Sequence, residues 1–414
     1  MAGDYLASRG IYILRQVTKR IWFRASLFSV AAIVTALVAA WIAPLIPYEL
    51  SLRVGGKAVD NILTILASSM LAVTTFALSA SVTAYGSATS AVTPRATQLL
   101  VDDRFTQNAL STFVGAFLFS IVGIIALTTG LYGAQGRVVL FFATIVIVAI
   151  IAITLLRWIQ HLSSFGRVRD TIERVETVAR RAMQAWAEAP HLGAQAPVAI
   201  PPETSPVYPA EIGYVAHIDV AGLARIADRH TLTIHIAELP GAFVFTERPL
   251  AHVAGVIDDK VRAAIEKTFS ILTDREFEQD PRFGLIVLSE IASRALSPAV
   301  NDPGTAIRVL GAGQRVLSDL VDTKRRAKVE HLRVHAPALE VDDMFDDFFR
   351  PIARDGASII EVQLRLLATL NGLATHAPGV LGETARRNAD AARLRAAEAL
   401  AFDGDRQAMR KSAR

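Results

Sequence analysis

Four long apolar runs constrain this 414-residue chain more than any other feature of its sequence. The hydrocarbon core of a bilayer is about 30 Å thick, and a helix of roughly 20 residues crosses it because each residue rises about 1.5 Å. The runs at residues 25–46, 62–84, 109–132 and 138–156 have about that length. We therefore predict a four-helix transmembrane domain at residues 1–160, followed by a water-soluble domain.

The composition supports this division of the chain. Hydrophobic residues make up 52% of the sequence and charged residues still 20%, so the two kinds must be segregated along it. The absence of cysteine excludes disulfides, thiolate metal sites and cysteine nucleophiles. The formal charge of +4 is small, and the basic residues lie beside the apolar runs. We therefore expect the lipid bilayer, and not nucleic acid, as a partner.

The distribution of Lys and Arg predicts the orientation of the spans, because basic loops resist translocation. Basic residues precede the first run, lie between the second and third at Arg95 and Arg104, and follow the fourth at residues 157–174. The opposite loops hold only Arg53, Lys57 and Arg137. Both termini and the water-soluble domain are therefore expected in the cytoplasm, with the first run as a retained anchor.

The second apolar run carries small hydroxyl side chains at helical spacing, which places them in one stripe. Such a stripe could line a pore, or it could serve helix packing, since small residues let two backbones approach closely. Runs two to four contain no Asp, Glu, Lys, Arg or His, which argues against a proton relay. The stripe consists of Thr64, Ser68, Thr75, Ser79 and Thr83.

The second half of the chain predicts an α+β domain. One-sided apolar spacing indicates that the fourth span continues as a cytoplasmic helix over residues 161–189. Six prolines then predict a linker at residues 190–210, which precedes a domain at residues 211–414. Its start reads as strands at 213–220, 231–239 and 242–246 around a helix at 221–229.

From Asp258 onward the sequence reads as helical. Asp280-Pro281 and Asp302-Pro303 each place a capping carboxylate before a proline at the first helical position. The acidic tract at residues 342–347 falls on several helix faces, and the histidines at 217–235 match no compact ligand spacing. We therefore predict no metal site and no cofactor.

One stretch resembles a known family. Residues 283–308 read FGLIVLSEIASRALSPAVNDPGTAIR, which closely resembles the signature of the bacterial predicted membrane proteins called DUF2254. Similarity extends to the turn at Pro240 and Gly241 and to Phe348, Phe349 and Arg350. The resemblance implies a multi-pass protein of the bacterial inner membrane, and it implies no catalytic residues.

The signature loop has two interpretations. It is a helix–helix joint if Ser297-Pro298 ends one helix and Asp302 caps the next. Alternatively, Arg294, Asn301 and Asp302 converge on a ligand or on a neighbouring subunit. We prefer a structural or subunit contact, and the candidate residues of this loop are Arg294, Ser297, Pro298, Asn301, Asp302 and Thr305.

The sequence leaves the function open between two classes. The leading hypothesis is a homo-oligomeric, channel-like or transport-related protein regulated by its cytoplasmic domain. The alternative is a membrane-anchored sensing or scaffolding protein without a transport path. Nucleophile elbows, phosphate-binding loops and His-Glu-x-x-His motifs are absent, so an enzyme is a third and less supported hypothesis with no catalytic residues to name.

Overall fold

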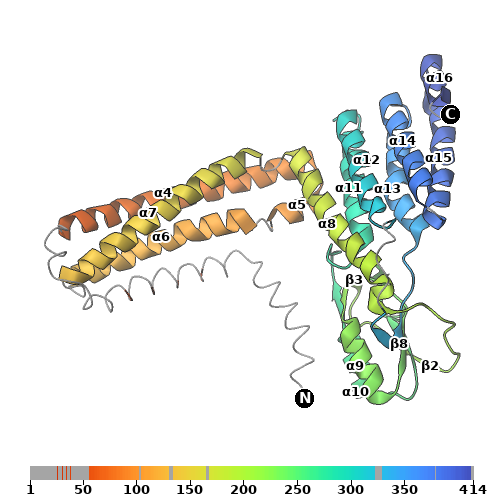
Figure 1. Cartoon of the computed structure of the whole chain (residues 1–414), viewed down its shortest axis with the longest axis horizontal. Coiled ribbons are helices and arrows are strands. Elements are labelled where there is room, and N and C mark those ends of the chain that lie inside the picture. Colours follow the sequence, from red (N-terminus) through yellow and green to blue (C-terminus); the bar gives the residue numbers. More distant parts are fainter. Residues whose placement is uncertain are drawn as a thin grey trace. The chain divides into compact units, whose positions relative to one another are not determined.

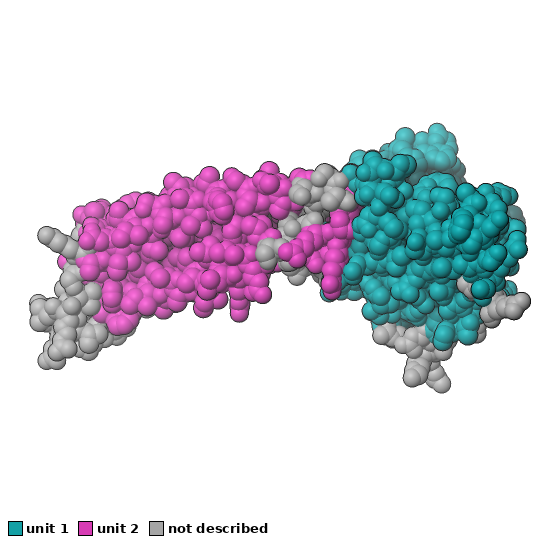
Figure 2. All heavy atoms as spheres, turned by 90° about the horizontal axis from the view of Figure 1, so that it is seen from above, with its two compact units in different colours: residues 1–10, 171–414 teal, residues 11–170 magenta. Residues whose placement is uncertain are grey.

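The computed structural model describes residues 56–101, 104–129, 134–164, 167–321, 329–377 and 379–411, together with four isolated positions, 26, 30, 34 and 38. Apart from these four positions, the predicted first span and the basic segment before it lie outside the described residues. The chain divides between Asp170 and Thr171 into two compact units, which Figure 2 colours magenta and teal. We refer to them as the N-terminal and C-terminal units.

Long helices form the described part of the N-terminal unit (Figure 1). Three segments are long and apolar enough to cross a membrane: Ala58–Gly86, Phe105–Thr128 and Arg137–Leu162. They coincide with the second, third and fourth predicted spans, whereas a total of four spans stays a prediction. The helices are α4 (Gly56–Ala91), α5 (Pro94–Val101), α6 (Arg104–Thr128) and α7 (Ala134–Ser164).

The small residues of the third span serve packing inside this unit. Ser111 and Ser120 are fully buried on α6. A Cβ built on Gly123 would lie 3.0 Å from the Leu63 side chain of α4, so the glycine allows α4 and α6 to approach closely. Phe113 and Phe119 are also fully buried on α6.

The C-terminal unit combines helices with two small sheets. Its helices are α8 (Val168–Glu188, which begins just before the boundary), the 3₁₀ turn η2 (Pro190–Gly193), α9 (Val220–His230), α10 (Asp259–Glu266), α11 (Pro281–Ala295), α12 (Pro303–Ser318), α13 (Val341–Asp355), α14 (Ile360–His376), α15 (Val380–Ala399) and α16 (Asp403–Lys411). Its strands are β1 (Ala194–Gln195), β2 (Thr204–Val207), β3 (Gly213–Ile218), β4 (Thr233–Ile236), β5 (Phe243–Val244), β6 (Ala251–Ala254), β7 (Phe269–Leu272) and β8 (His331–His335).

The larger sheet has the order β1-β8-β4-β6-β2, and the smaller one the order β5-β3-β7. Strand β8 runs parallel to β1 and β4, whereas β6 runs antiparallel to β4 and β2. Helix α9 covers one face of the larger sheet, because its Leu223 and Ile226 share a buried apolar cluster with Ile234, Val253 and Val334 of the strands. This cluster is the core of the α/β part of the unit.

The predicted helical extension at residues 161–189 corresponds to the end of α7, at Ser164, and to α8, which begins at Val168. Two other predictions about this region are wrong. The expected linker at residues 190–210 contains β1 and β2, and β2 accommodates Pro206 because an edge strand tolerates a missing N–H. Strands β7 and β8 interrupt the region expected to be wholly helical, because β7 pairs with β3 and β8 with β1 and β4, all of which are distant along the chain.

Candidate functional site

The signature loop is a joint between α11 and α12. The Asp302 carboxylate accepts the Thr305 N–H at 3.1 Å and the Thr305 hydroxyl at 2.6 Å, and thereby caps α12. Asn301 takes a left-handed conformation with φ of 48°, as the turn requires. The Ser297 hydroxyl donates to the Arg294 carbonyl at 2.7 Å, which closes the end of α11. Pro298 is exposed.

This geometry is that of the predicted joint. The side chains of Arg294, Asn301 and Asp302 are exposed on the C-terminal unit. A ligand or subunit contact at this loop therefore stays a prediction.

Helix α8 lies tightly against α11 at one point. A Cβ on Gly284 would lie 2.3 Å from the Ala179 Cβ and 2.9 Å from its Cα. Because non-bonded carbons rest about 3.5–4.0 Å apart, only glycine fits there. The glycine in the Phe283–Leu285 part of the signature is thus explained by the close approach of α8.

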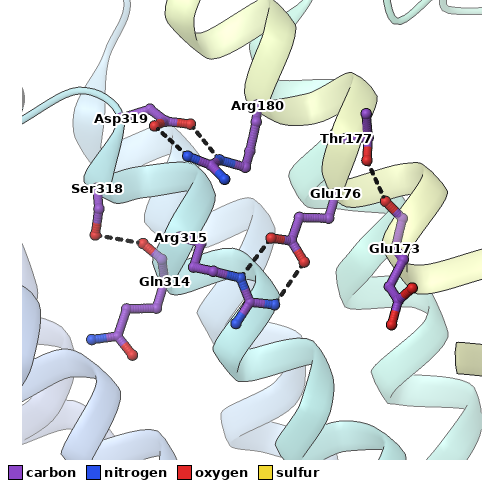
Figure 3. Close-up of polar contacts among 8 residues, drawn as sticks. All are labelled: Glu173, Glu176, Thr177, Arg180, Gln314, Arg315, Ser318 and Asp319. Atoms are coloured by element: carbon purple, nitrogen blue, oxygen red, sulfur yellow. Dashed lines mark hydrogen bonds and ion pairs between the residues drawn. The ribbon is translucent and has the colours of Figure 1, made fainter.

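Two ion pairs join α8 to α12 (Figure 3). The Arg315 guanidinium donates twice to the Glu176 carboxylate, with both distances 2.6 Å. The Arg180 guanidinium donates twice to Asp319, at 2.8 and 3.0 Å. These hydrogen bonds raise the pKa of both arginines, and both carboxylates are largely buried. We call these four residues the α8–α12 clamp.

The clamp fixes how the two helices run. Each pair joins residues 139 positions apart, so the positions advance together along both helices and α8 lies parallel to α12 at this point. The charges are reversed between the pairs, because α8 contributes an acid and then a base, and α12 a base and then an acid. A displacement by one helical turn would therefore bring like charges together.

A pocket of about 340 Å³ opens next to the same helix. This volume is at the lower end of the range for small-molecule sites. Helix α8 lines it with Ala182, Ala185 and Trp186, and the small alanine side chains leave this space open. The opposite side is the corner at which β3 ends and α9 begins. The lining residues are Ala182, Ala185, Trp186, Ala189, Leu192, His217, Ile218, Asp219, Val220, Ala221, Glu278, Gln279 and His331.

Polar groups of the pocket are held by the backbone around them. The Asp219 carboxylate caps α9 by accepting the Gly222 N–H at 2.8 Å, and Arg225 lies 3.6 Å from its other oxygen. The Gln279 side chain accepts the Ile218 N–H at 2.9 Å and donates to the Ile218 carbonyl. The corner between β3 and α9 is therefore fixed before any ligand arrives.

The segment that carries Glu278 and Gln279 is anchored by the buried Asp280. Its carboxylate accepts the N–H groups of Arg282 and Phe283 at 3.1 Å each and pairs with Arg275 at 2.7 Å. Burial raises the pKa of Asp280 although Arg275 opposes the shift. Gly241, with φ of 92°, lies so close that a Cβ would come within 2.3 Å of this carboxylate.

The hydroxyl stripe lies on an exposed face of α4 in the single chain. The hydroxyls of Thr64, Ser68, Thr75 and Thr83 donate to backbone carbonyls four residues earlier, at 2.9–3.0 Å. Ser79 shares the exposed face, together with large apolar side chains such as Phe76 and Leu78. The stripe does not pack inside the described part of the unit, and both of its interpretations stay predictions.

The carboxylates in the acidic tract of α13 form ion pairs with arginines and accept a hydrogen bond from a threonine. Arg282 pairs with Asp343 and Asp347 at 2.5 and 2.7 Å. Asp342 accepts from Thr384 and Arg387, and Asp346 pairs with Arg350. Within the described ranges, no cluster of three or more His, Asp or Glu side chains is arranged to hold a metal ion.

With this geometry established, a comparison with known families decides the membership. A family model described as "Predicted membrane protein (DUF2254)" matches residues 18–372. The chain belongs to the DUF2254 family. Its signature stretch forms α11, the joint and the first turn of α12, so the family signature lies where α8 is held.

Similar proteins occur in mycobacteria. An "Uncharacterized protein" of Mycobacterium bovis is 32% identical over 156 residues, which cover 34% of this chain and 30% of the relative. Two such proteins from strains of Mycobacterium tuberculosis share the same identity and coverage. The match thus spans about a third of the length of these relatives. No solved structure matches the chain.

Sequence reasoning missed the clamp and the pocket. The clamp had a signal, because Glu176 with Arg180, and Arg315 with Asp319, are opposite charges four residues apart. Such pairs are usually interpreted as neighbours on one helix. In the structure each pairs with the other helix, which no single-helix pattern reveals.

Proposed function

We propose that this DUF2254 protein is a membrane-anchored sensor, in which a small ligand binds the pocket beside α8 and changes the state of the membrane helices. The observation that carries the proposal is that one helix, α8, both lines the pocket and is clamped to α12. Helix α8 lines the pocket through Ala182, Ala185 and Trp186, and it is clamped to α12 through Glu176 and Arg180. It is also the first helix after the last candidate span.

The pocket favours a small ligand with an apolar body and a polar end. Trp186 and the alanines offer an apolar wall, whereas His217, Asp219 and Glu278 line the other side. Small-molecule sites commonly combine a mainly apolar lining with a few fixed polar groups. A ligand that fills the space against α8 would bias the position of that helix only if it binds two positions unequally.

Pocket filling tests the first half of the proposal. Ala185→Phe should occupy the space, whereas Ala187→Phe, on the same helix but outside the lining, is the matched control. The full-length protein, purified in mild detergent, is screened by thermal shift against a library of small amines and carboxylates. We expect a compound that stabilises the wild type and Ala187→Phe but not Ala185→Phe. Equal stabilisation of all three proteins, or no stabilising compound, contradicts the pocket as the sensory site.

The orientation of the chain belongs to the same proposal. The basic residues around the spans favour a cytoplasmic C-terminal unit in the bacterial inner membrane. Reporter fusions after Gly136 and Leu192 should then read periplasmic and cytoplasmic, respectively. A periplasmic signal after Leu192 would place the pocket outside the cell and exclude a cytoplasmic ligand.

A homo-oligomeric transport protein is the second candidate, and the exposed hydroxyl stripe of α4 favours it. In this naturally cysteine-free chain, single cysteines at Thr64, Ser68 and Thr75 should react with small charged thiol reagents if the stripe meets water. Leu78, which is exposed on the same helix, reports lipid contact, and the fully buried Leu63 reports packing. Reaction of the stripe but not of Leu78 would support a transport path, whereas uniform inertness would favour the sensor.

A further inference from the structure

The segment between β1 and β2 has to cross the larger sheet. Strands β1 and β2 form its opposite edges, which are about 19 Å apart at four spacings of about 4.8 Å. The nine residue steps from Gln195 to Thr204 reach at most about 32 Å when extended. A detour around the sheet is too long, so residues 196–203 pass over one of its faces. We call this segment the strap.

The strap passes over the face opposite to α9. The α9 face holds Ile234, Val253 and Val334 in the apolar core. Side chains alternate along a strand, so His235, His252 and His335 point to the other face. The ring of His335 contacts the Ala196 carbonyl through Nδ1 at 2.8 Å, which places the start of the strap on this face.

Beneath the strap the three histidines form a row across neighbouring strands. His235 of β4 lies in register with His252 of β6 and with His335 of β8. The rings of His235 and His335 are stacked, with centroids 5.0 Å apart and planes 12° from parallel. His235, in the middle of the row, is only 4% exposed. Stacked rings direct their nitrogens along parallel planes and not toward a common metal ion.

We propose that this histidine row is a proton-operated latch, which holds the strap on the sheet when the imidazoles are neutral and releases it when they are protonated. Histidine is the side chain that changes charge between about pH 8 and pH 5. Two imidazolium ions at stacking distance repel each other, and the buried position of His235 keeps water from its charge. Release of the strap relieves both effects because it admits water to the row.

The surroundings of His235 agree with this latch. Burial lowers its pKa first, and the neighbouring His335 and His252 lower it further. On β8, Arg333 lies 3.5 Å from Asp228 of α9. From α10, the Arg262 guanidinium bonds the Pro206 carbonyl on β2. Glu203 is the one acidic residue of the strap.

A spin label on the strap tests the latch in the full-length protein. Ala199→Cys gives a single labelling site on the exposed part of the strap, because the chain has no native cysteine. Electron paramagnetic resonance is recorded at pH 7.5 and pH 5.5. We expect an immobilised component that is lost at the lower pH. A label at Arg229, on α9, is the control and should keep its spectrum.

The same label in His235→Phe separates the latch from general acid effects. Phenylalanine keeps an aromatic ring in the row but removes the central charge, so the immobilised component should persist at pH 5.5. His252→Gln, which removes an outer charge, should shift the loss to lower pH, and it serves if His235→Phe does not fold. His230→Gln, outside the row, should behave like the wild type. A strap whose mobility ignores pH, or responds equally in the row variants, overturns the proposal.

Discussion

Replacement of Gly284 by alanine tests whether α8 is as closely held as its contacts indicate. The added Cβ would lie 2.3 Å from the Ala179 Cβ and 2.9 Å from its Cα, so the α8 backbone itself has to move. Overpacking of this kind costs up to about 3 kcal/mol, and the helix propensity of alanine returns about 1 kcal/mol. We expect a net loss of about 2 kcal/mol, which in a unit of this size lowers Tm by about 4–8 °C.

Thermal unfolding of the full-length protein in detergent measures this loss, and a second glycine supplies the control. A Cβ on Gly311 of α12 would meet only Arg315 and Arg365 side-chain atoms, at 3.6 and 4.0 Å. Gly311→Ala should therefore raise Tm slightly. The double variant Ala179→Gly with Gly284→Ala removes the 2.3 Å contact with the Ala179 Cβ and should therefore recover part of the loss. Recovery should be incomplete, because the 2.9 Å contact with the Cα of residue 179 remains. If both single glycine variants change Tm in the same direction, the close approach of α8 and α11 is refuted.

Three further predictions concern the clamp, the joint and the histidine row. A double-mutant cycle of Glu176→Ala and Arg315→Ala, measured by chemical unfolding, should give a coupling of about 1 kcal/mol, since Arg315 is 54% exposed and partly screened; additive effects would mean that the pair contributes nothing. Asp302→Ala should lower the free energy of unfolding by about 1 kcal/mol, and Asp302→Ser should recover most of that loss. If the loop instead binds a ligand or a subunit, Asp302→Ser should fold normally but fail in assembly or activity. The lowered pKa of His235 means that folding favours its neutral form. Its contribution to stability is therefore full above about pH 6.5 and is lost as the pH falls through that lowered pKa. In urea titrations at several pH values, His235→Phe should reduce this loss of unfolding free energy, and an unchanged dependence on pH would contradict the reasoning.

Local patterns in the sequence predicted much of the fold. Continuous apolar runs located three segments able to span a membrane, because length and composition alone decide that property. The caps at Asp280 and Asp302 were predicted as well, since a capping carboxylate and the N–H groups it accepts lie within three residues. The predicted strand–helix–strand order around α9 also matches the structure.

What the sequence did not predict depends on partners distant along the chain. Strand β8 has one fully buried apolar residue, Val334, and becomes a strand because β1 and β4 lie on both sides. The proline-rich segment was predicted to be a linker because its composition suits neither helix nor strand. Its ends pair at the two edges of a sheet, and edges are where prolines and short strands are tolerated.

The candidate site was hidden for a related reason. Alanines on α8 read as ordinary helix formers, and they line a pocket only because the corner of β3 and α9 lies opposite. The signature loop was found from the sequence because it resembles a family pattern. Its role as a joint follows from hydrogen bonds of Asp302 and Ser297 within the loop itself.

The arrangement of charges in the clamp resists sliding of α8 along α12. A slide of α8 by one turn, about 5.4 Å, would bring Arg180 against Arg315 in one direction and Glu176 against Asp319 in the other. Each slide also leaves a largely buried carboxylate without its arginine, which is costly. Axial movement of α8 is therefore favoured only when α12 moves with it, and α12 begins at the joint that Asp302 caps. A force along α8 would therefore also act on α12, whose first turn belongs to the family signature.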